Sequence, residues 1–330
     1  DSAVTTLSVE VVYCTLSANF ITPPNGCQET CFTFTETSTV FGQQNNIEVY
    51  WCFDWDPSTN PWTCNINNNP LWIPYVLNDQ ITYCYQNPGE YIVYHEIEDT
   101  ITGLDDWDTS SIVVHPKPNA VIDSCLNVCK GIEEEWTHSS WIDSLSTPNN
   151  NQQIIGSTWY IYDDLFIPLN PPGTSTNSLT YTFNTPGIYY IVLEVTSNNN
   201  CLGYDTCQIE VYDLPAKPLS ANDSVCFGGQ NPILSASGTN IKWYLDTLAS
   251  PIQLGNNYLP SVVATAIYTY YVTQTNGNLC ESNATAVTFE IFNLPAKPLS
   301  ANDSVCFGDQ NPVLSASGTN IKWYLDTLAS

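Results

Sequence analysis

The sequence has 330 residues, with 33 acidic residues, six lysines and no arginine, so its formal net charge is −27. A strongly negative field repels polyanions, and arginine is the residue best suited to grip phosphate. Nucleic acids and anionic lipid surfaces are therefore poor partners, and we expect no nucleic-acid binding. Hydrophobic residues make up 43% of the chain. That is enough to build folded cores, which excludes a disordered chain.

The cysteine content indicates an oxidising compartment, because there are 13 cysteines and no CxxC zinc pattern. We therefore expect an extracellular protein. No stretch approaches the roughly 20 apolar residues that cross a bilayer, so we expect no membrane insertion in this segment. The sequence has no initiator methionine and no signal peptide, and Asp1 is either a mature N-terminus or an arbitrary cut.

Short runs rich in Val, Ile, Thr and Tyr recur along the chain, including 81–99 and 179–197. They alternate with period two, and asparagine-rich turns at 67–69, 149–151 and 198–200 separate them. This pattern is typical of strands, and no run shows convincing helical spacing. We predict an all-β protein built of tandem β-sandwich modules in an extended rod.

An internal repeat supports the modular reading. Residues 214–250 recur at 294–330 with only two changes, at an offset of 80 residues. A unit of that length is a plausible small sandwich, whereas the last segment is too short to close one. An older repeat relates 81–99 to 179–197.

We place the domain boundaries at a recurring linker in which a short β-forming run is followed by proline, lysine and proline. It occurs at 113–118, 211–218 and 291–298. Proline stiffens such joints and blocks strand continuation. We predict four domains: a sandwich with a disulfide-rich insertion at 1–115, a sandwich at 116–213, a sandwich at 214–293, and the truncated start of an identical repeat at 294–330.

The first two units share a proline-glycine-tyrosine motif. Pro186-Gly187-Ile188-Tyr189-Tyr190-Ile191-Val192, with Trp159 upstream, resembles the PKD-type sandwich, and Pro88-Gly89-Glu90-Tyr91-Ile92-Val93 repeats the motif. The resemblance implies PKD-like folds for both units, although the first lacks the family's GDG turn. The tyrosine is placed to anchor a corner, as in immunoglobulin-like folds.

The third unit has a different signature. Val225-Cys226-Phe227-Gly228, Ile241-Lys242-Trp243-Tyr244 and a later Tyr270-Tyr271-Val272 resemble the immunoglobulin-like repeats of secreted Bacteroidota proteins. Together the modules are similar to giant type IX-secreted (SprB-like) surface adhesins of gliding bacteria and to related filament proteins. The resemblance implies a glycosylated protein attached to the outer membrane of a Gram-negative cell, with a role in attachment, gliding or a surface appendage.

We expect disulfides within each unit. Cys226 and Cys280 are the only cysteines of the third unit, so we expect them to pair, while Cys306 repeats Cys226 and its partner would fall beyond the sequence. In the first unit we expect a local Cys52–Cys64 bridge. The pairing of Cys14, Cys27, Cys31 and Cys84 stays open. In the second unit we expect Cys125 and Cys129 to pair with Cys201 and Cys207, in either order.

No catalytic constellation stands out, and we predict no enzymatic activity. The three histidines are His95, His115 and His138. His95 replaces an apolar position of the aligned strand, and His115 lies in a linker. His138 with Ser139, Ser140 and Asp143 superficially suggests a triad, but the GxSxG context is missing and a polar loop is the simpler interpretation.

Acidic residues cluster near predicted strand ends, where carboxylate oxygens could bind calcium or merely keep a loop solvated. The candidate calcium ligands are Asp54, Asp56, Glu96, Glu98, Asp99, Asp105, Asp106 and Asp108. We expect no other cofactor.

Two further surface features are readable. Trp62 and Trp72 lie in a Pro/Asn-rich insertion, where they either contact a sugar or protein or cover the sandwich. The triplet Asp-Ser/Thr-apolar resembles an O-glycosylation acceptor of the same phylum, but it is also common in polar loops. It occurs at Ser2, Thr100, Ser144, Ser224, Thr247, Ser304 and Thr327.

These features favour a structural and adhesive segment of a long repetitive surface protein. Its expected partners are neighbouring repeats of the same chain, other copies in a filament, and a surface polysaccharide or protein. The alternative is a set of carbohydrate-binding accessory modules of a secreted hydrolase.

Overall fold

The computed structural model describes residues 15–41, 46–56, 58, 64, 76–143, 151–170, 173 and 175–325, and the backbone of 71–74. This part of the chain contains β-strands and no helix. It divides into two compact units, Asp1–Val211 and Tyr212–Ser330, each of which is described by itself. The all-β prediction is confirmed.

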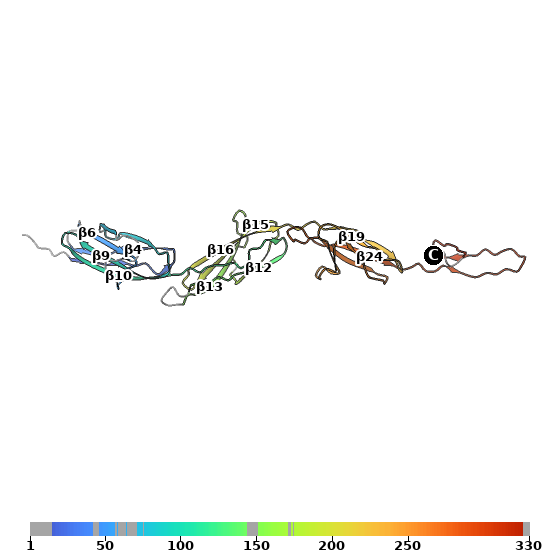
Figure 1. The fold of residues 1–330 in the computed structure, drawn as a ribbon, viewed down its shortest axis with the longest axis horizontal. Helices are drawn as coiled ribbons and strands as arrows, with labels where there is room; N and C mark the ends of the chain where they lie inside the picture. The colour runs from blue at the N-terminus through green and yellow to red at the C-terminus, as the bar shows by residue number, and fades with distance from the viewer. Residues whose placement is uncertain are drawn as a thin grey trace, which may run out of the picture. The chain divides into compact units, whose positions relative to one another are not determined.

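Module 1 lies in the first unit and comprises β1 to β10 (Figure 1). A five-stranded sheet of order β3-β10-β9-β6-β7 faces a three-stranded sheet of order β2-β4-β8, and β1 pairs with β5. The core between the sheets contains Phe34, Trp51 and Ile97. The strands are β1 (Thr15–Ser17), β2 (Phe20–Ile21), β3 (Gly26–Cys27), β4 (Cys31–Glu36), β5 (Thr39–Phe41), β6 (Ile47–Cys52), β7 (Leu71–Pro74), β8 (Gln80–Cys84), β9 (Gly89–Asp99) and β10 (Leu104–His115).

Module 2 follows in the same unit and has its own core around Trp159, Ile191 and Leu193. A four-stranded sheet of order β11-β16-β15-β13 is accompanied by the pair β12-β14. From Tyr189 onward every second residue of β15 is buried, so the alternation seen in the sequence is the burial pattern of the strand. The strands are β11 (Val128–Cys129), β12 (Glu133–Thr137), β13 (Ile154–Asp163), β14 (Ser178–Thr182), β15 (Gly187–Ser197) and β16 (Leu202–Tyr212).

Module 3 lies in the second unit, with a separate core around Trp243, Val272 and Phe289. Its sheets have the orders β18-β24-β23-β20-β21 and β17-β19-β22. The repeated segment after it forms the short pair β25 and β26. The strands are β17 (Leu219–Ser220), β18 (Asp223–Cys226), β19 (Leu234–Ser237), β20 (Lys242–Tyr244), β21 (Gln253–Leu254), β22 (Asn257–Tyr258), β23 (Ile267–Thr273), β24 (Thr285–Phe292), β25 (Leu299–Ser300) and β26 (Ala316–Ser317).

Each module has a buried tryptophan on a strand of its larger sheet: Trp51, Trp159 or Trp243. Two of the indole nitrogens find acceptors across the core. Trp159 Nε1 donates to the carbonyl of Thr176, and Trp243 Nε1 donates to that of Gly255, both at 3.1 Å. Burying a large ring with its N–H satisfied is strongly stabilising.

Each module also has a tyrosine whose hydroxyl donates to the carbonyl four residues earlier. The pairs are Tyr91 with Asn87 at 2.9 Å, Tyr189 with Thr185 at 2.9 Å and Tyr268 with Ala264 at 3.1 Å. This contact pins the loop to the strand that follows it, as the corner tyrosine does in sandwich domains. The predicted corner is therefore present, and it extends to module 3.

Candidate functional site

The point where the chain leaves module 1 carries a cysteine. Cys27 ends β3, which pairs in parallel with β10 and places Cys27 opposite His115, the last residue of β10. The chain then turns, because Gln28 N donates to His115 O at 2.8 Å and Thr30 N donates to Cys27 O at 3.2 Å. The sulfur of Cys27 is therefore held where the chain leaves module 1.

A second cysteine closes the hairpin between β15 and β16 of module 2. Ser197 N donates to Cys201 O at 2.9 Å, and Cys201 N donates to Ser197 Oγ at 3.1 Å. Asn200 takes up a φ of 60°, a left-handed conformation that asparagine tolerates well. Cys201 is fully buried, so the hairpin holds its sulfur in a fixed position.

Cys27 and Cys201 form a disulfide with a Cα–Cα distance of 5.6 Å, although 174 residues separate them in the sequence. The linker makes further contacts beside the bond. Lys117 Nζ donates to Glu29 Oε2 at 2.9 Å, and Gly203 lies so close to Pro118 that a Cβ would come within 2.0 Å of the proline carbonyl oxygen. Modules 1 and 2 are therefore joined twice, by the chain and by a covalent cross-link.

Three further disulfides lie within modules. Cys31–Cys84 bridges the paired strands β4 and β8, Cys52–Cys64 is confirmed as expected, and Cys125–Cys207 clips the start of module 2 to β16. Cys129 and Cys280 are also disulfide-bonded. Cys226 and Cys306 are free and exposed.

The predicted Cys226–Cys280 bridge is wrong, because the two residues lie at opposite ends of β24. Cys226 pairs with Phe292 at the end of that strand, whereas Cys280 lies in the hairpin before its start at Thr285. Eight residues of strand span roughly 26 Å, far beyond the approximately 7 Å that a disulfide can bridge between Cα atoms.

The prediction for module 2 is correct in one pairing only. Cys125 pairs with Cys207, but Cys201 bonds to Cys27 and so to neither Cys125 nor Cys129. The cause is again position along a strand. Asn127 Oδ1 accepts from Glu210 N, which places Cys129 near the end of β16, whereas Cys201 precedes its start.

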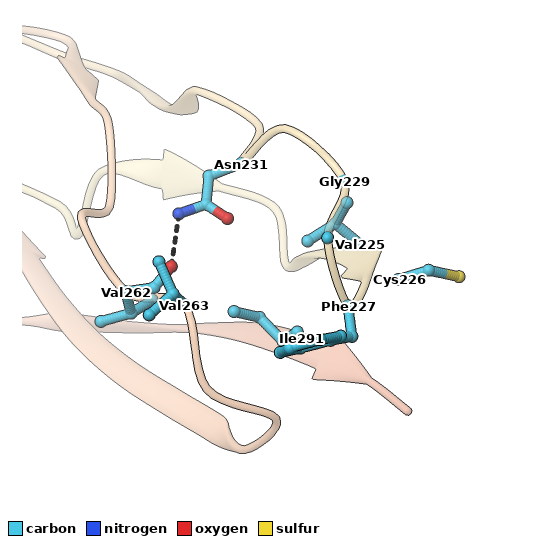
Figure 2. Close-up of a pocket in the computed structure, with 9 residues that line it drawn as sticks. Val225, Cys226, Phe227, Gly229, Asn231, Val262, Val263 and Ile291 are labelled. Carbon is cyan, nitrogen blue, oxygen red and sulfur yellow. Dashed lines mark hydrogen bonds between the residues drawn. The ribbon is translucent and has the colours of Figure 1, made fainter. Parts of the chain in front are cut away.

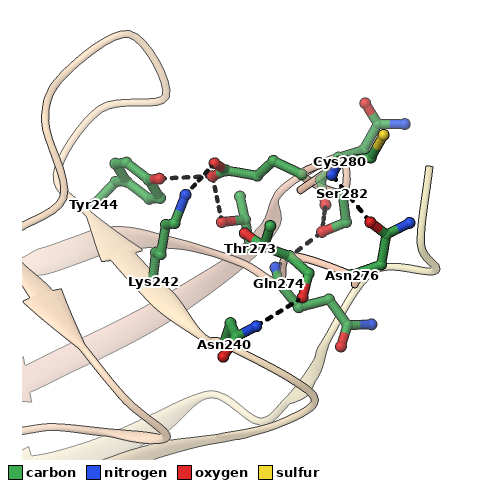
Figure 3. Close-up of polar contacts among 11 residues, drawn as sticks. Asn240, Lys242, Tyr244, Thr273, Gln274, Asn276, Cys280 and Ser282 are labelled. Atoms are coloured by element: carbon green, nitrogen blue, oxygen red, sulfur yellow. Dashed lines mark hydrogen bonds and ion pairs between the residues drawn. The ribbon is translucent and has the colours of Figure 1, made fainter. Parts of the chain in front are cut away.

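The hairpin of module 3 that carries Cys280 is braced by the next residue, Glu281. Figure 3 labels Cys280 and the three donors to this carboxylate, Lys242, Tyr244 and Thr273. The carboxylate of Glu281 accepts from Lys242 Nζ at 2.7 Å, Tyr244 OH at 2.6 Å and Thr273 Oγ1 at 2.6 Å. Burial opposes its ionisation, but these donors outweigh burial and hold the pKa of Glu281 below its ordinary value. The network fixes the hairpin to β20 and β23.

The eight candidate calcium ligands are described, and they do not gather into a site. No group of three or more His, Cys, Asp or Glu that could hold a metal occurs among the described residues. Asp106 Oδ2 accepts from Ala18 N, and Asp99 Oδ1 accepts from Ile101 N. Tyr94 OH donates to Glu96 Oε2 at 3.0 Å, and burial raises the pKa of Glu96. Asp106 and Asp99 thus accept hydrogen bonds from the backbone of neighbouring loops. The others of the set are Asp54, Asp56, Glu98, Asp105 and Asp108.

Four of the predicted glycan acceptors lie in the described chain, and all four are exposed: Thr100, Ser224, Thr247 and Ser304. At Ser224 and Ser304 the preceding aspartate accepts from the backbone N–H of the acceptor itself, at 2.7 Å and 2.8 Å. The hydroxyl of Thr100 donates to Asn46 O at 3.1 Å. Ser2, Ser144 and Thr327 lie outside the described residues.

An aromatic surface that the sequence did not indicate lies on module 1. Trp107 is 54% exposed, and its ring lies 5.9 Å from that of Tyr94 and 6.5 Å from that of Trp55. Trp62 and the side chain of Trp72 lie outside the described residues. The alternation of β10, which turns Trp107 to the outer face, is the signal that could have identified it.

The polar loop of module 2 is not assembled as a triad. His138 lies against Trp159, and its Nδ1 is 3.1 Å from Ser140 Oγ. Asp123 accepts from Thr137 Oγ1 at 2.7 Å, so the polar residues of this loop bond to one another. Among the described residues no helix is long and apolar enough to cross a membrane.

Comparison with known proteins agrees with the topology. The sequence profile of a family described as Ig-like domain CHU_C associated matches residues 215–292, which contain the strands of module 3. No curated protein matches the chain significantly. The chain is thus an all-β protein of tandem immunoglobulin-like modules, and its disulfides are typical of an extracellular or secreted protein.

Several solved structures are similar in part. The three N-terminal domains of the bacteriophage RB49 highly immunogenic outer capsid protein are 14% identical, with a TM-score of 0.30, over 85% of this chain and 100% of that chain. A marsupial T cell receptor is 10% identical, with a TM-score of 0.32, over 84% and 100%. The PKD domain of an M14-like peptidase from Thermoplasmatales archaeon SCGC AB-540-F20 is 22% identical, with a TM-score of 0.22, over 30% and 93%.

Proposed function

We propose that the chain is a structural and adhesive segment of a long, repetitive cell-surface protein, in which successive modules transmit tension between a cell and its contact. The observation that carries the proposal is the Cys27–Cys201 bond between modules 1 and 2. The repeated segments 214–250 and 294–330 and the resemblance to surface adhesins of gliding bacteria support it. Export by the type IX route and attachment to an outer membrane belong to the same proposal.

The Cys27–Cys201 disulfide determines which residues carry a force that pulls on the chain. Residues 28–200 lie inside the covalent loop that Cys27 and Cys201 close. A force applied to the two ends of the unit passes from Cys27 to Cys201 through the disulfide. Most strands of modules 1 and 2 are thus removed from the path, and they cannot lengthen the chain even if they unfold. This arrangement limits how far the chain can lengthen under tension, which suits a mechanical tether.

Single-molecule stretching tests the proposal. The chain is held at its two termini and fully extended, first oxidised and then in a phosphine reductant. The bond replaces 174 residue spacings by one short link, so the oxidised chain should be shorter by at least roughly 600 Å at full extension. Equal extended lengths in the two states would contradict the mechanical role.

A second candidate function is carbohydrate binding, which the exposed ring of Trp107 beside Tyr94 and Trp55 favours. Aromatic faces of this kind stack on sugar rings. Screening the intact chain against an oligosaccharide array, with Trp107→Ala as the matched variant, tests it. Binding that the substitution abolishes would support sugar recognition by this surface, and a blank array would leave the structural role.

A further inference from the structure

We propose that Cys226 forms a disulfide with the hairpin cysteine of the module that follows it, by the geometry that joins Cys27 to Cys201. The inference deepens the proposed function, since it would extend cross-linking along the repeats. Its test reads covalent connectivity alone, so its failure and that of the mechanical role are distinguishable.

Cys226 occupies the position in module 3 that Cys27 occupies in module 1. It ends β18, which pairs in parallel with β24, and it lies opposite Phe292, the last residue of that strand. Phe227 N donates to Phe292 O at 2.8 Å, and Gly229 N donates to Cys226 O at 2.9 Å. These are the same two hydrogen bonds that shape the turn after Cys27. The thiol group is therefore presented at the module exit.

The same turn recurs after two further cysteines. Ile132 N donates to Cys129 O at 3.3 Å, and Asp309 N donates to Cys306 O at 3.1 Å. Cys129, at the end of the first strand of module 2, is disulfide-bonded, as Cys27 is. Cys226 and Cys306 have free thiols. In modules 1 and 2 the cysteine before this turn is therefore disulfide-bonded.

Cys201, the partner of Cys27, lies in a hairpin whose local geometry recurs around Cys280. The hairpins 196–201 and 275–280 read Thr-Ser-Asn-Asn-Asn-Cys and Thr-Asn-Gly-Asn-Leu-Cys. In each, the second side chain accepts from the cysteine N–H, at 3.1 Å from Ser197 Oγ and 3.0 Å from Asn276 Oδ1. Cys201 and Cys280 are both fully buried. Residues 294–325 repeat the first part of module 3, so a module completed along that sequence carries this hairpin.

The surroundings of Cys226 require a partner from outside module 3. The residue borders a cavity of about 260 Å³ lined by Asn231 and by apolar side chains, among them Val225, Val262 and Ile291. Its sulfur points away from that cavity (Figure 2). Cys280, the other cysteine of the module, lies at the far end of β24 and is bonded elsewhere.

The chemistry is ordinary thiol–disulfide exchange. The two thiols lose one proton each and two electrons together, and the Sγ–Sγ bond forms. A disulfide oxidant, such as glutathione disulfide, takes up the two electrons and two protons as its own S–S bond breaks into two thiols. The exposed thiol of Cys226 is accessible to such an oxidant.

The experiment completes the fourth module. Residues 251–293 are appended again after Ser330, and a matched chain carries serine in place of the copied Cys280. Both chains and the original are folded in a glutathione redox buffer, blocked with iodoacetamide, digested without reduction and mapped by mass spectrometry. We expect Cys226 linked to the copied cysteine in the completed chain, and alkylated in the serine chain and in the original.

The Cys27–Cys201 peptide pair reports correct folding in every sample. If that pair is present while Cys226 is alkylated in the completed chain, or is linked to Cys306, the proposal is overturned. Should the appended half-module not fold, a second chain decides, in which residues 1–293 are followed by a copy of module 2, residues 116–213, whose hairpin carries a copy of Cys201. There, a link between Cys226 and the copied Cys201 supports the proposal, and alkylated Cys226 refutes it.

Discussion

The carboxylate of Glu36 lies 2.5 Å from Nε2 of His95 in the core of module 1. His95 pairs with Trp51 across the sheet, at the position where Leu193 faces Trp159 in module 2. Its side chain is 0% exposed and that of Glu36 is 3% exposed. Burial works against the charged carboxylate. The hydrogen bond and charge of His95, with the N–H of Ser38, outweigh it and hold the pKa of Glu36 below its ordinary value.

The stability of module 1 should therefore fall in acid. Because the pKa of Glu36 is lower in the folded state than in the unfolded chain, its contribution is complete above the ordinary value of 4.5 and is lost as pH falls through the folded value. Denaturant titrations between about pH 7 and about pH 3 check this. Glu36→Gln should be less stable near neutrality and should show a weaker pH dependence. Equal pH slopes for the two proteins would contradict the assignment.

Removing one partner of the pair should cost more than removing both. His95→Leu leaves a buried carboxylate without its partner, and we expect a loss of about 3–5 kcal/mol in the free energy of unfolding. The double variant Glu36→Leu with His95→Leu replaces the pair by apolar contacts of the kind Leu193 makes, and it should regain most of that loss. Urea midpoints of the two variants measure the difference. A double variant less stable than His95→Leu would disprove the argument.

Cutting the linker should not separate modules 1 and 2. Cys31–Cys84 and Cys52–Cys64 lie before the segment 116–118, and Cys125–Cys207 lies after it, whereas Cys27–Cys201 spans it. With a specific protease site inserted in that segment, the cut chain should run as one band on a denaturing gel without reductant, and as two bands with it. The matched variant Cys27→Ser with Cys201→Ser should give two bands in both conditions.

The corner tyrosines of modules 2 and 3 can be compared directly. Tyr189 is buried, and its hydroxyl bonds both to Thr185 O at 2.9 Å and to Thr185 Oγ1 at 2.6 Å. Tyr189→Phe should destabilise module 2 by about 1 kcal/mol or more, because it leaves a loop carbonyl unpaired. Tyr268→Phe, at a more exposed corner with one bond, should cost less. Thermal unfolding of the two variants gives the order, and a reversed order would contradict the role of burial.

The sequence predicts the sandwich cores well because they depend on local alternation. Apolar residues alternate with polar ones in runs such as the one around Tyr189, and that pattern decides which face of the strand is buried. It also identifies His95 as a polar residue in an apolar position. It does not identify Glu36 as its partner, because that contact joins residues 59 apart through the packing of two sheets.

Cysteine pairing failed for a related reason. Counting cysteines within a unit assumes that bridges stay inside it, but spacing does not reveal at which end of a sheet each thiol lies. Cys226 and Cys280 belong to one module and lie at opposite ends of β24, whereas Cys27 and Cys201 belong to different modules and meet at one junction. The matching hairpin sequences 196–201 and 275–280 are the signal that marks the receiving cysteines.

The close approach of Gly203 to Pro118 leads to a final prediction at the same junction. A Cβ at Gly203 would lie 2.0 Å from Pro118 O and 3.3 Å from Pro118 Cγ, and a backbone oxygen cannot rotate away as a side chain can. Gly203→Ala should therefore displace the linker from β16 and destabilise the first unit by about 1–3 kcal/mol. Gly156→Ala in β13 is the matched control, since nothing lies within 4 Å of its Cβ, and it should be neutral or slightly stabilising. Chemical unfolding of the two variants measures both effects, and equal stabilities would show that the linker does not need to lie against Gly203.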